Sequence, residues 1–285
     1  MTVQDTVELT QEGTSRWVQT KDWSIHYQEA GSGHPLILIH GSGPGASGWS
    51  NFSPNIGPLA ERFRVLAIDV PGWGDSDSAT PEQADSVGAL VQFMDELGIE
   101  RAALVGNSMG GIIATSLAAA HPERVSHLVT MGTGSFPTPT LFGAAGPSEG
   151  IKVLVAGYRD PSPETMRRLA DVMTFDPGFA TEEMVAKRAE AAARRDDHRA
   201  NFLAGFGQPG YMPFATPEQV ASITAPTLLI HGRDDRVVHF EHSLRLCSLI
   251  RNSRLYLLNR CGHWAQLEHA AEFNRVVADF VGTGA

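Results

Sequence analysis

The sequence contains little of what several classes of protein require. Cys247 and Cys261 are its only cysteines in 285 residues, too few for a disulfide framework or a cysteine-based zinc site. No window approaches the roughly 18 consecutive apolar residues of a membrane-spanning helix. The first 15 residues are polar and acidic, which is not the basic and then apolar layout of a secretory signal. These absences predict a cytoplasmic protein with free thiols.

Basic charge is also scarce. The formal net charge is −10, and no block is rich in lysine or arginine, which argues against nucleic-acid or anionic-membrane partners. A small anionic substrate could still be met by a local arginine. With 42% apolar and 19% charged residues, the chain is an ordinary globular protein that is long enough to bury a large core.

Short apolar runs alternate with helix-like segments along most of the chain, as in folds with buried strands. The strands are expected in an opening hairpin over 17–30 and in apolar runs at 35–39, 64–69, 102–105, 125–131, 225–231 and 254–258. Helices are expected at 86–97 and 268–281. This alternation predicts an α/β fold with a mainly parallel sheet that helices cover on both faces.

One long stretch interrupts the alternation. Between about 134 and 222 no strand is predicted, only helix-like segments at 165–173 and 181–195. An insertion of this length between two core strands is interpreted as a helical cap over the C-terminal edge of the sheet. The predicted division is a core at 1–133, a cap at 134–222 and the rest of the core at 223–285.

The run Gly106–Gly111 (Gly-Asn-Ser-Met-Gly-Gly) lies between an expected strand and a helix-like segment. A strand, a G-x-S-x-G motif and a helix form a nucleophile elbow, in which small residues let the chain turn sharply and expose the serine hydroxyl. Ser108 is therefore the candidate nucleophile. The alternative is a glycine-bearing helix start with Ser108 in its first turn.

A serine nucleophile needs a base, and the base needs a carboxylate that orients it. His263 follows the last expected strand in a Gly-His loop, although a core or surface histidine is the alternative. Asp234 and Asp235 both follow the strand at 225–231, and the motif leaves open which of them is the acid. The chain order of serine, acid and histidine is that of an elbow enzyme.

Attack on a carbonyl places charge on its oxygen, so backbone N–H donors are needed nearby. Met109 directly follows the nucleophile and should supply one N–H group. A second donor is expected from the run His40-Gly41-Ser42-Gly43, most directly from Ser42, because small residues allow close approach to a ligand. The alternative for this run is a simple tight turn.

These motifs together resemble one family. The runs 40–51 and 106–111 are similar to those of the meta-cleavage product hydrolases, which are α/β-hydrolases that cleave carbon–carbon bonds in ring-fission products of aromatic compounds. The runs 232–236 and 261–266 match the acid and histidine motifs of that family. The resemblance covers nearly the whole chain, and it implies an α/β-hydrolase fold with an inserted helical cap, no cofactor and no metal.

Carried over by position, the resemblance implies that Asp235 is the triad acid. It also implies a substrate-binding role for Arg188 on a cap helix, although an arginine on such a helix is often only part of a solvated face. Ser42 stands where many members of the family have glycine, which leaves the role of its hydroxyl open. The remaining implied substrate contacts are Gly41, Gly43, Asn51, Asn107 and Trp264.

The activity implied by the resemblance is cleavage of the C5–C6 bond of 2-hydroxy-6-oxohexa-2,4-dienoates that carry a variable group on C6. The partner is then a small anionic dienoate, and relatives suggest a homodimer or larger homo-oligomer. Two alternatives remain: a carboxylesterase or perhydrolase on the same fold, and a non-catalytic small-molecule receptor.

Overall fold

A computed structural model describes residues 9–135, 140–143 and 146–282. In the described residues one sheet has the strand order β1-β2-β4-β3-β5-β6-β7-β8. The antiparallel pairs are β1 with β2 and β2 with β4, and the other neighbours are parallel. The strands span Ser15–Gln19, Ser24–Ala30, Pro35–Ile39, Arg64–Ile68, Ala102–Asn107, Val125–Met131, Thr227–Gly232 and Ser253–Leu258, from β1 to β8.

The predicted strands all occur, and the differences at their ends have local causes. Strands β3 and β6 have the predicted bounds. Strand β7 begins at Thr227 rather than at 225, because Pro226 has no N–H group for the strand ladder. Strand β5 continues to Asn107, so the nucleophile follows the strand directly.

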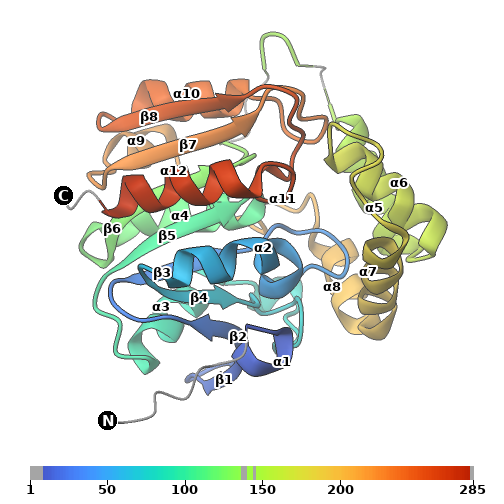
Figure 1. The fold of residues 1–285 in the computed structure, drawn as a ribbon, viewed down its shortest axis with the longest axis horizontal. Coiled ribbons are helices and arrows are strands. Elements are labelled where there is room, and N and C mark those ends of the chain that lie inside the picture. Colours follow the sequence, from blue (N-terminus) through green and yellow to red (C-terminus); the bar gives the residue numbers. More distant parts are fainter. Residues whose placement is uncertain (1–8, 136–139, 144–145, 283–285) are drawn as a thin grey trace.

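Helices cover both faces of the sheet (Figure 1). Helices α3, α4, α9 and α10 contribute to one apolar cluster, and α2 and α12 contribute to the other. These six helices span Ser86–Glu96, Met109–Ala120, Pro217–Ala221, Glu241–Leu249, Gly48–Ala60 and Ala270–Gly282, in that order. The shortest elements are α1 (Gln11–Thr14), α11 (Ala265–Glu268) and two 3-10 turns (Pro81–Gln83 and Pro122–Arg124).

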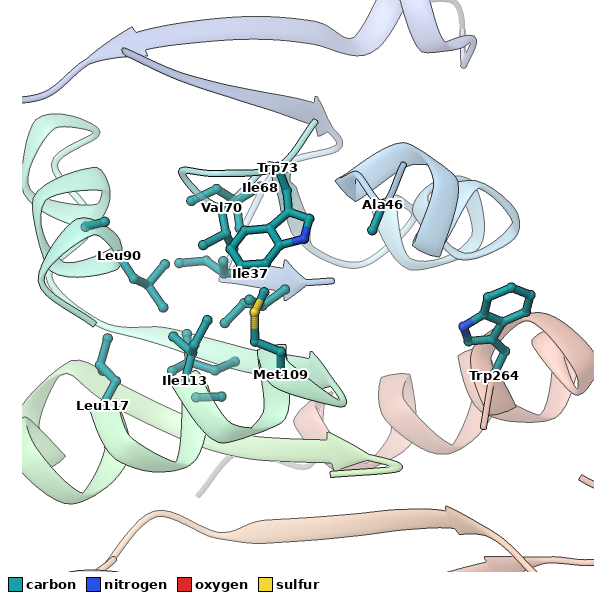
Figure 2. Packing of buried hydrophobic residues seen from close by; sticks show 14 of the residues in the cluster. Ile37, Ala46, Ile68, Val70, Trp73, Leu90, Met109, Ile113, Leu117 and Trp264 are labelled. Atoms are coloured by element: carbon teal, nitrogen blue, oxygen red, sulfur yellow. The ribbon is translucent and has the colours of Figure 1, made fainter. Parts of the chain in front are cut away.

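The apolar runs are continuous because the central strands are buried on both sides. In β3, Ile37 and Ile39 join the first cluster, whereas Leu36 and Leu38 join the second. Successive side chains of a strand point to opposite faces, so each face needs its own apolar set. Figure 2 shows part of the first cluster around Met109, at the start of α4.

Four helices lie together at one end of the sheet, between β6 and β7 in the sequence (Figure 1). Two of them, α6 (Pro163–Met173) and α7 (Glu182–Arg194), match the predicted helix-like segments. The other two, α5 (Glu149–Arg159) and α8 (Asp196–Gly205), were not among the predicted helix-like segments. Glycines at 150 and 157 weaken the helical pattern of α5, and α8 is short and polar at its start.

The described part of the stretch between β6 and β7 contains no strand. We retain the division into core and cap at 134 and 222 as a proposal. Its ranges include residues 1–8, 136–139, 144–145 and 283–285, which lie outside the described residues. Buried side chains of α5 and α6 belong to the same apolar cluster as α4, so these helices pack directly on the core.

Candidate active site

Ser108 lies in the sharp turn between β5 and α4. Its φ of 52° and ψ of −114° form a conformation that residues other than glycine rarely adopt. The turn requires small neighbours, since a Cβ atom at Gly106 would lie 2.2 Å from the carbonyl oxygen of Gly110. The Ser108 N–H donates to the Met131 carbonyl at 2.9 Å. Ser108 is partly exposed between buried neighbours, so its hydroxyl is the accessible group of the turn.

The carboxylate of Asp235 is buried, and both of its oxygens have polar partners. Its Oδ2 lies 2.7 Å from Nδ1 of His263 and 3.3 Å from Nε2 of His231. Its Oδ1 accepts the N–H groups of Val237 and Val238 at 2.7 and 2.9 Å. Burial by itself raises the pKa of this carboxyl, but the two histidines outweigh burial and hold the pKa below its ordinary value. Asp235 is thus an ionised carboxylate that fixes the orientation of His263.

Asp234, the alternative acid, is held elsewhere. Its N–H donates to the Cys261 carbonyl at 3.0 Å, and its Oδ1 lies 3.8 Å from Nη2 of Arg233. Within the described residues its carboxylate contacts no histidine. Of the two candidates, only Asp235 therefore bonds His263.

His263 is buried at the carboxyl ends of the central strands. Its N–H donates to the Met173 carbonyl at 2.7 Å, and its carbonyl lies 3.4 Å from Nδ2 of Asn107. A Cβ atom at Gly132 would lie 2.8 Å from the ring Nδ1, so glycine makes room for the imidazole. Ser108 Oγ has no hydrogen-bond partner among the described residues. The structure brings serine and histidine to the same edge without closing their bond, a common feature of ligand-free sites.

The loop after β3 runs beside the nucleophile turn. A Cβ atom at Gly41 would lie 3.3 Å from Cβ of Ser108, and the Gly41 N–H donates to Oδ1 of Asn51 at 3.3 Å. The Val70 N–H donates to Nε2 of His40 at 3.0 Å. Nδ1 of His40 therefore carries the proton, which it donates to the Gly41 carbonyl at 2.8 Å. Burial lowers the pKa of His40 and favours this neutral form.

The two predicted oxyanion donors remain available. Within the described part of the chain, the backbone N–H groups of Ser42 and Met109 have no acceptor. The Met109 side chain is buried in the core (Figure 2), which fixes the first residue of α4 beside Ser108. Two fixed and unpaired N–H groups next to a serine are what a tetrahedral oxyanion requires.

Arg188 projects from α7 toward the same loop. Its Cζ lies 4.8 Å from the ring centroid of Trp264, and its Nη1 donates to the Pro44 carbonyl at 3.4 Å. A Cβ atom at Gly43 would lie 3.4 Å from this Nη1. Burial lowers the pKa of Arg188 to about 10, so the guanidinium still carries its charge at neutral pH. No carboxylate pairs with it among the described residues.

Arg188 and Trp264 line a cavity of about 650 Å³ between α7 and the core. The described lining does not include Ser108 or His263. Its other cations already have acidic partners; Arg194, for example, lies 2.7 Å from Asp75. Arg188 is therefore a cation whose charge is available to an anionic ligand.

In the described residues, one group has suitable atom types and spacing for a metal ion: His26, Asp69 and Asp75, with ligand atoms within 4.8 Å of one another. Protein partners already engage these atoms. Asp69 accepts the Gly48 N–H at 2.6 Å and lies 2.8 Å from Nδ1 of His26, while Asp75 binds Arg194. These bonds tie the loop after β4 to β2 and α2 and are sufficient to explain the cluster.

Two residues that touch the site were not singled out from the sequence. His231 shares the carboxylate of Asp235, and its place four residues earlier in the same motif was the available signal. Tyr158 donates a hydrogen bond to the Ser42 carbonyl from a position 116 residues away. No sequence motif links that pair, because the contact depends on how α5 docks on the core.

The chain is similar to known proteins over nearly its whole length. Residues 34–270 match the family model described as the alpha/beta hydrolase fold. A 2-hydroxy-6-oxononadienedioate/2-hydroxy-6-oxononatrienedioate hydrolase of Cupriavidus pinatubonensis is 43% identical over 283 residues, 96% of this chain and 97% of that protein. A 2-hydroxy-6-oxo-6-phenylhexa-2,4-dienoate hydrolase of Comamonas testosteroni is 42% identical, over 96% and 98% of the two chains.

A solved structure agrees with these relatives. It is a serine-to-alanine mutant of the meta-cleavage product hydrolase of Pseudomonas fluorescens IP01, complexed with acetates. It superposes with a TM-score of 0.84 at 33% identity, over 94% of this chain and 97% of that chain. The chain belongs to the meta-cleavage product hydrolases. The predicted α/β-hydrolase fold of this hydrolase is thereby confirmed, and none of its described helices is long and apolar enough to cross a membrane.

Proposed function

We propose that this hydrolase cleaves the C5–C6 bond of 2-hydroxy-6-oxo-6-substituted-hexa-2,4-dienoates. The products are 2-hydroxypenta-2,4-dienoate and a carboxylic acid. The observation that carries the proposal is Arg188: a charged guanidinium without an acidic partner among the described residues, stacked on Trp264 and next to the loop of Gly43. Hydrolysis of a neutral ester needs no such cation, whereas a dienoate carboxylate does.

The electron flow explains why the carboxylate end must be held. Moving the 2-hydroxyl proton to C5 converts the dienol into a 2-oxo compound, which can accept the electron pair of the breaking bond. Ser108 then attacks the C6 carbonyl while His263 takes the serine proton. The N–H groups of Ser42 and Met109 stabilise the oxyanion.

Collapse of this intermediate breaks the C5–C6 bond. The electron pair moves through C5 to the 2-oxygen, which Arg188 stabilises, and the first product leaves as the dienol after protonation. Water, activated by His263, releases the carboxylic acid from Ser108. Asp235 holds the imidazole in the required tautomer and stabilises its protonated form.

Polar groups around the loop complete the proposed substrate contacts. Asn51 holds the Gly41 N–H, and Asn107 holds the backbone at His263, so both amides orient the site as well as border it. The relatives named above act on dioate and on phenyl substrates. Because these substrates differ in the group on C6, the proposal specifies only the dienoate part of the substrate. Turnover rates over a panel of 6-alkyl and 6-aryl dienoates would identify the group on C6.

The test compares two substrates on the wild-type protein. Turnover of a 6-substituted dienoate with feeble hydrolysis of p-nitrophenyl esters supports the proposal. Strong ester hydrolysis alone would establish a carboxylesterase or perhydrolase instead. Binding of the dienoate without turnover, measured by a spectral shift that does not decay, would indicate a receptor.

We also propose that this hydrolase acts in the cytoplasm as a homodimer or larger homo-oligomer, without nucleic-acid or membrane partners. The free thiols of Cys247 and Cys261 and the net charge of −10 support the compartment and the absence of anionic macromolecular partners. Light scattering coupled to size exclusion would determine the mass in solution.

A further inference from the structure

Tyr158 on α5 reaches the loop that carries the proposed oxyanion donor Ser42. Its phenolic oxygen lies 2.6 Å from the Ser42 carbonyl oxygen and 2.9 Å from Nε1 of Trp73. The tyrosine is only 2% exposed, so solvent does not replace these bonds. Its ring stacks on Phe202 of α8, with 3.8 Å between the ring centroids and an angle of 11° between the planes.

The direction of both hydrogen bonds follows from the donors. An indole nitrogen can only donate, whereas a phenol has one proton to give and can also accept. Trp73 therefore donates to Tyr158, and Tyr158 must donate its own proton to the Ser42 carbonyl. Burial raises the pKa of Tyr158 well above its ordinary value of 10.0, so the phenol keeps this proton over the whole working range.

Two successive carbonyls of the loop are thus anchored. His40 donates to the Gly41 carbonyl at 2.8 Å, and Tyr158 donates to that of Ser42 at 2.6 Å. In a planar trans peptide the C=O and N–H bonds point in opposite directions. Anchoring the Gly41 carbonyl therefore aims the Ser42 N–H, and anchoring the Ser42 carbonyl aims the Gly43 N–H.

The anchored loop borders both halves of the site. A Cβ atom at Gly41 would lie 3.3 Å from Cβ of Ser108, and one at Gly43 would lie 3.4 Å from Nη1 of Arg188. A rotation of the Ser42–Gly43 peptide would therefore remove the support on one side of Ser42, whose N–H is the proposed oxyanion donor.

We propose that Tyr158 is a positioning residue that fixes the oxyanion loop and makes its geometry depend on the docking of α5. The proposal rests on the proposed function of Ser42 as an oxyanion donor. Without the hydroxyl, the Ser42 carbonyl loses a buried donor, and the Ser42 N–H loses one of the two anchors that flank it. Transition-state stabilisation then falls, while ground-state binding of the substrate changes little.

The magnitude follows from what is lost. Complete removal of an oxyanion donor lowers kcat by about 10²–10³-fold. A misaligned donor still contributes, so Tyr158→Phe should lower kcat by about 10–100-fold with KM within about twofold. Tyr256→Phe is the matched control, because Tyr256 lies on edge strand β8 and bonds Glu272; its kcat should stay within about twofold of wild type.

Three assays on the full chain keep the proposal separate from the substrate assignment. They are turnover of a 6-phenyl dienoate, turnover of p-nitrophenyl acetate, and the rate at which a fluorophosphonate labels Ser108. Every reaction at Ser108 uses the oxyanion loop, so Tyr158→Phe should slow all three that the wild type performs. Failure of the wild type on the dienoate alone would refute the proposed function and leave the other two assays to test Tyr158.

Loss of stability is controlled separately. Leu246→Ala removes a buried side chain of α10, far in sequence from the loop and 1% exposed, and should lower Tm without lowering kcat per labelled site. Tyr158→Phe should lower kcat per labelled site even where its Tm is the higher of the two. A kcat within about threefold of wild type, or a rise in KM with kcat intact, would overturn the proposal.

Discussion

Replacing Arg188 by glutamine tests the carboxylate site most directly. The guanidinium has five N–H donors, yet its one hydrogen bond within the described residues is the 3.4 Å contact with the Pro44 carbonyl. Trp264 covers one face at 4.8 Å, and the other N–H donors have no acceptor among the described residues. The structure thus provides a fork-shaped cation with nothing acidic to neutralise it among the described side chains.

The magnitude follows from two charge-assisted bonds. Each is worth about 1.5–3 kcal/mol when desolvated. The cavity admits some water, so we take about 3–4 kcal/mol for the pair, which is about a 10²–10³-fold loss of kcat/KM on the dienoate. Hydrolysis of p-nitrophenyl acetate has no carboxylate to lose and should change by less than about threefold. Arg188→Lys keeps the charge but not the fork, so its loss should be intermediate.

Lys187→Gln provides the matched control. Lys187 precedes Arg188 on α7, its side chain is 75% exposed, and it pairs with Glu183 on the surface. Its removal should leave both activities unchanged. Equal losses on ester and dienoate in Arg188→Gln would refute the carboxylate role. So would a marked fall in Tm, because removing a desolvated cation without an acidic partner should leave the fold as stable as before or more stable.

Three further predictions concern two residues of the proposed triad and one buried histidine. Ser108→Ala should lower dienoate turnover by about a thousandfold or more, and near-normal rates would show that the nucleophile is elsewhere. Asp235→Asn should lower kcat by about 10³–10⁴-fold with KM little changed, because His263 loses the acceptor that sets its tautomer; a loss confined to KM would contradict this. Burial lowers the pKa of His198 from 6.5 to about 4, so its contribution to stability is complete above pH 6.5 and is lost as the pH falls toward 4. The Tm should therefore fall less steeply between pH 7.5 and 4 in His198→Leu than in wild type. Parallel plots of Tm against pH for the two proteins would contradict this prediction.

The sheet was predictable because its central strands are buried on both faces and therefore need apolar side chains at successive positions. Continuous apolar runs such as Leu36–Ile39 have few alternatives to a buried strand, and the turn at Ser108 is fixed by the small residues around it. The helices α5 and α8 were not predictable in the same way. Their positions depend on packing against the core and against each other, which the local pattern of α5, weakened by Gly150 and Gly157, does not encode.

The residues of the candidate site show the same difference between what local motifs predict and what long-range packing determines. Local motifs at strand ends identified Ser108 and His263 as candidates. They limited the candidates for the triad acid to Asp234 and Asp235. The structure distinguishes those neighbours through one bond, 2.7 Å from Asp235 to His263. Arg188 entered through resemblance alone, since a helix with alternating charges looks like a solvated face until its burial is known.

The proposed anion-binding residue and the proposed anchor of the oxyanion loop both come from the helices between β6 and β7. Arg188 belongs to α7 and supplies the charge, and Tyr158 belongs to α5 and holds the loop between that charge and Ser108. The proposed triad, by contrast, lies wholly on the strands and loops of the sheet. A displacement of these helices would therefore leave Ser108, His263 and Asp235 assembled but remove both the anion site and one anchor of the oxyanion loop. Such a state would lose the proposed charge at the dienoate carboxylate and would weaken one of the two proposed oxyanion donors, so we expect it to lose carbon–carbon cleavage while keeping an intact triad.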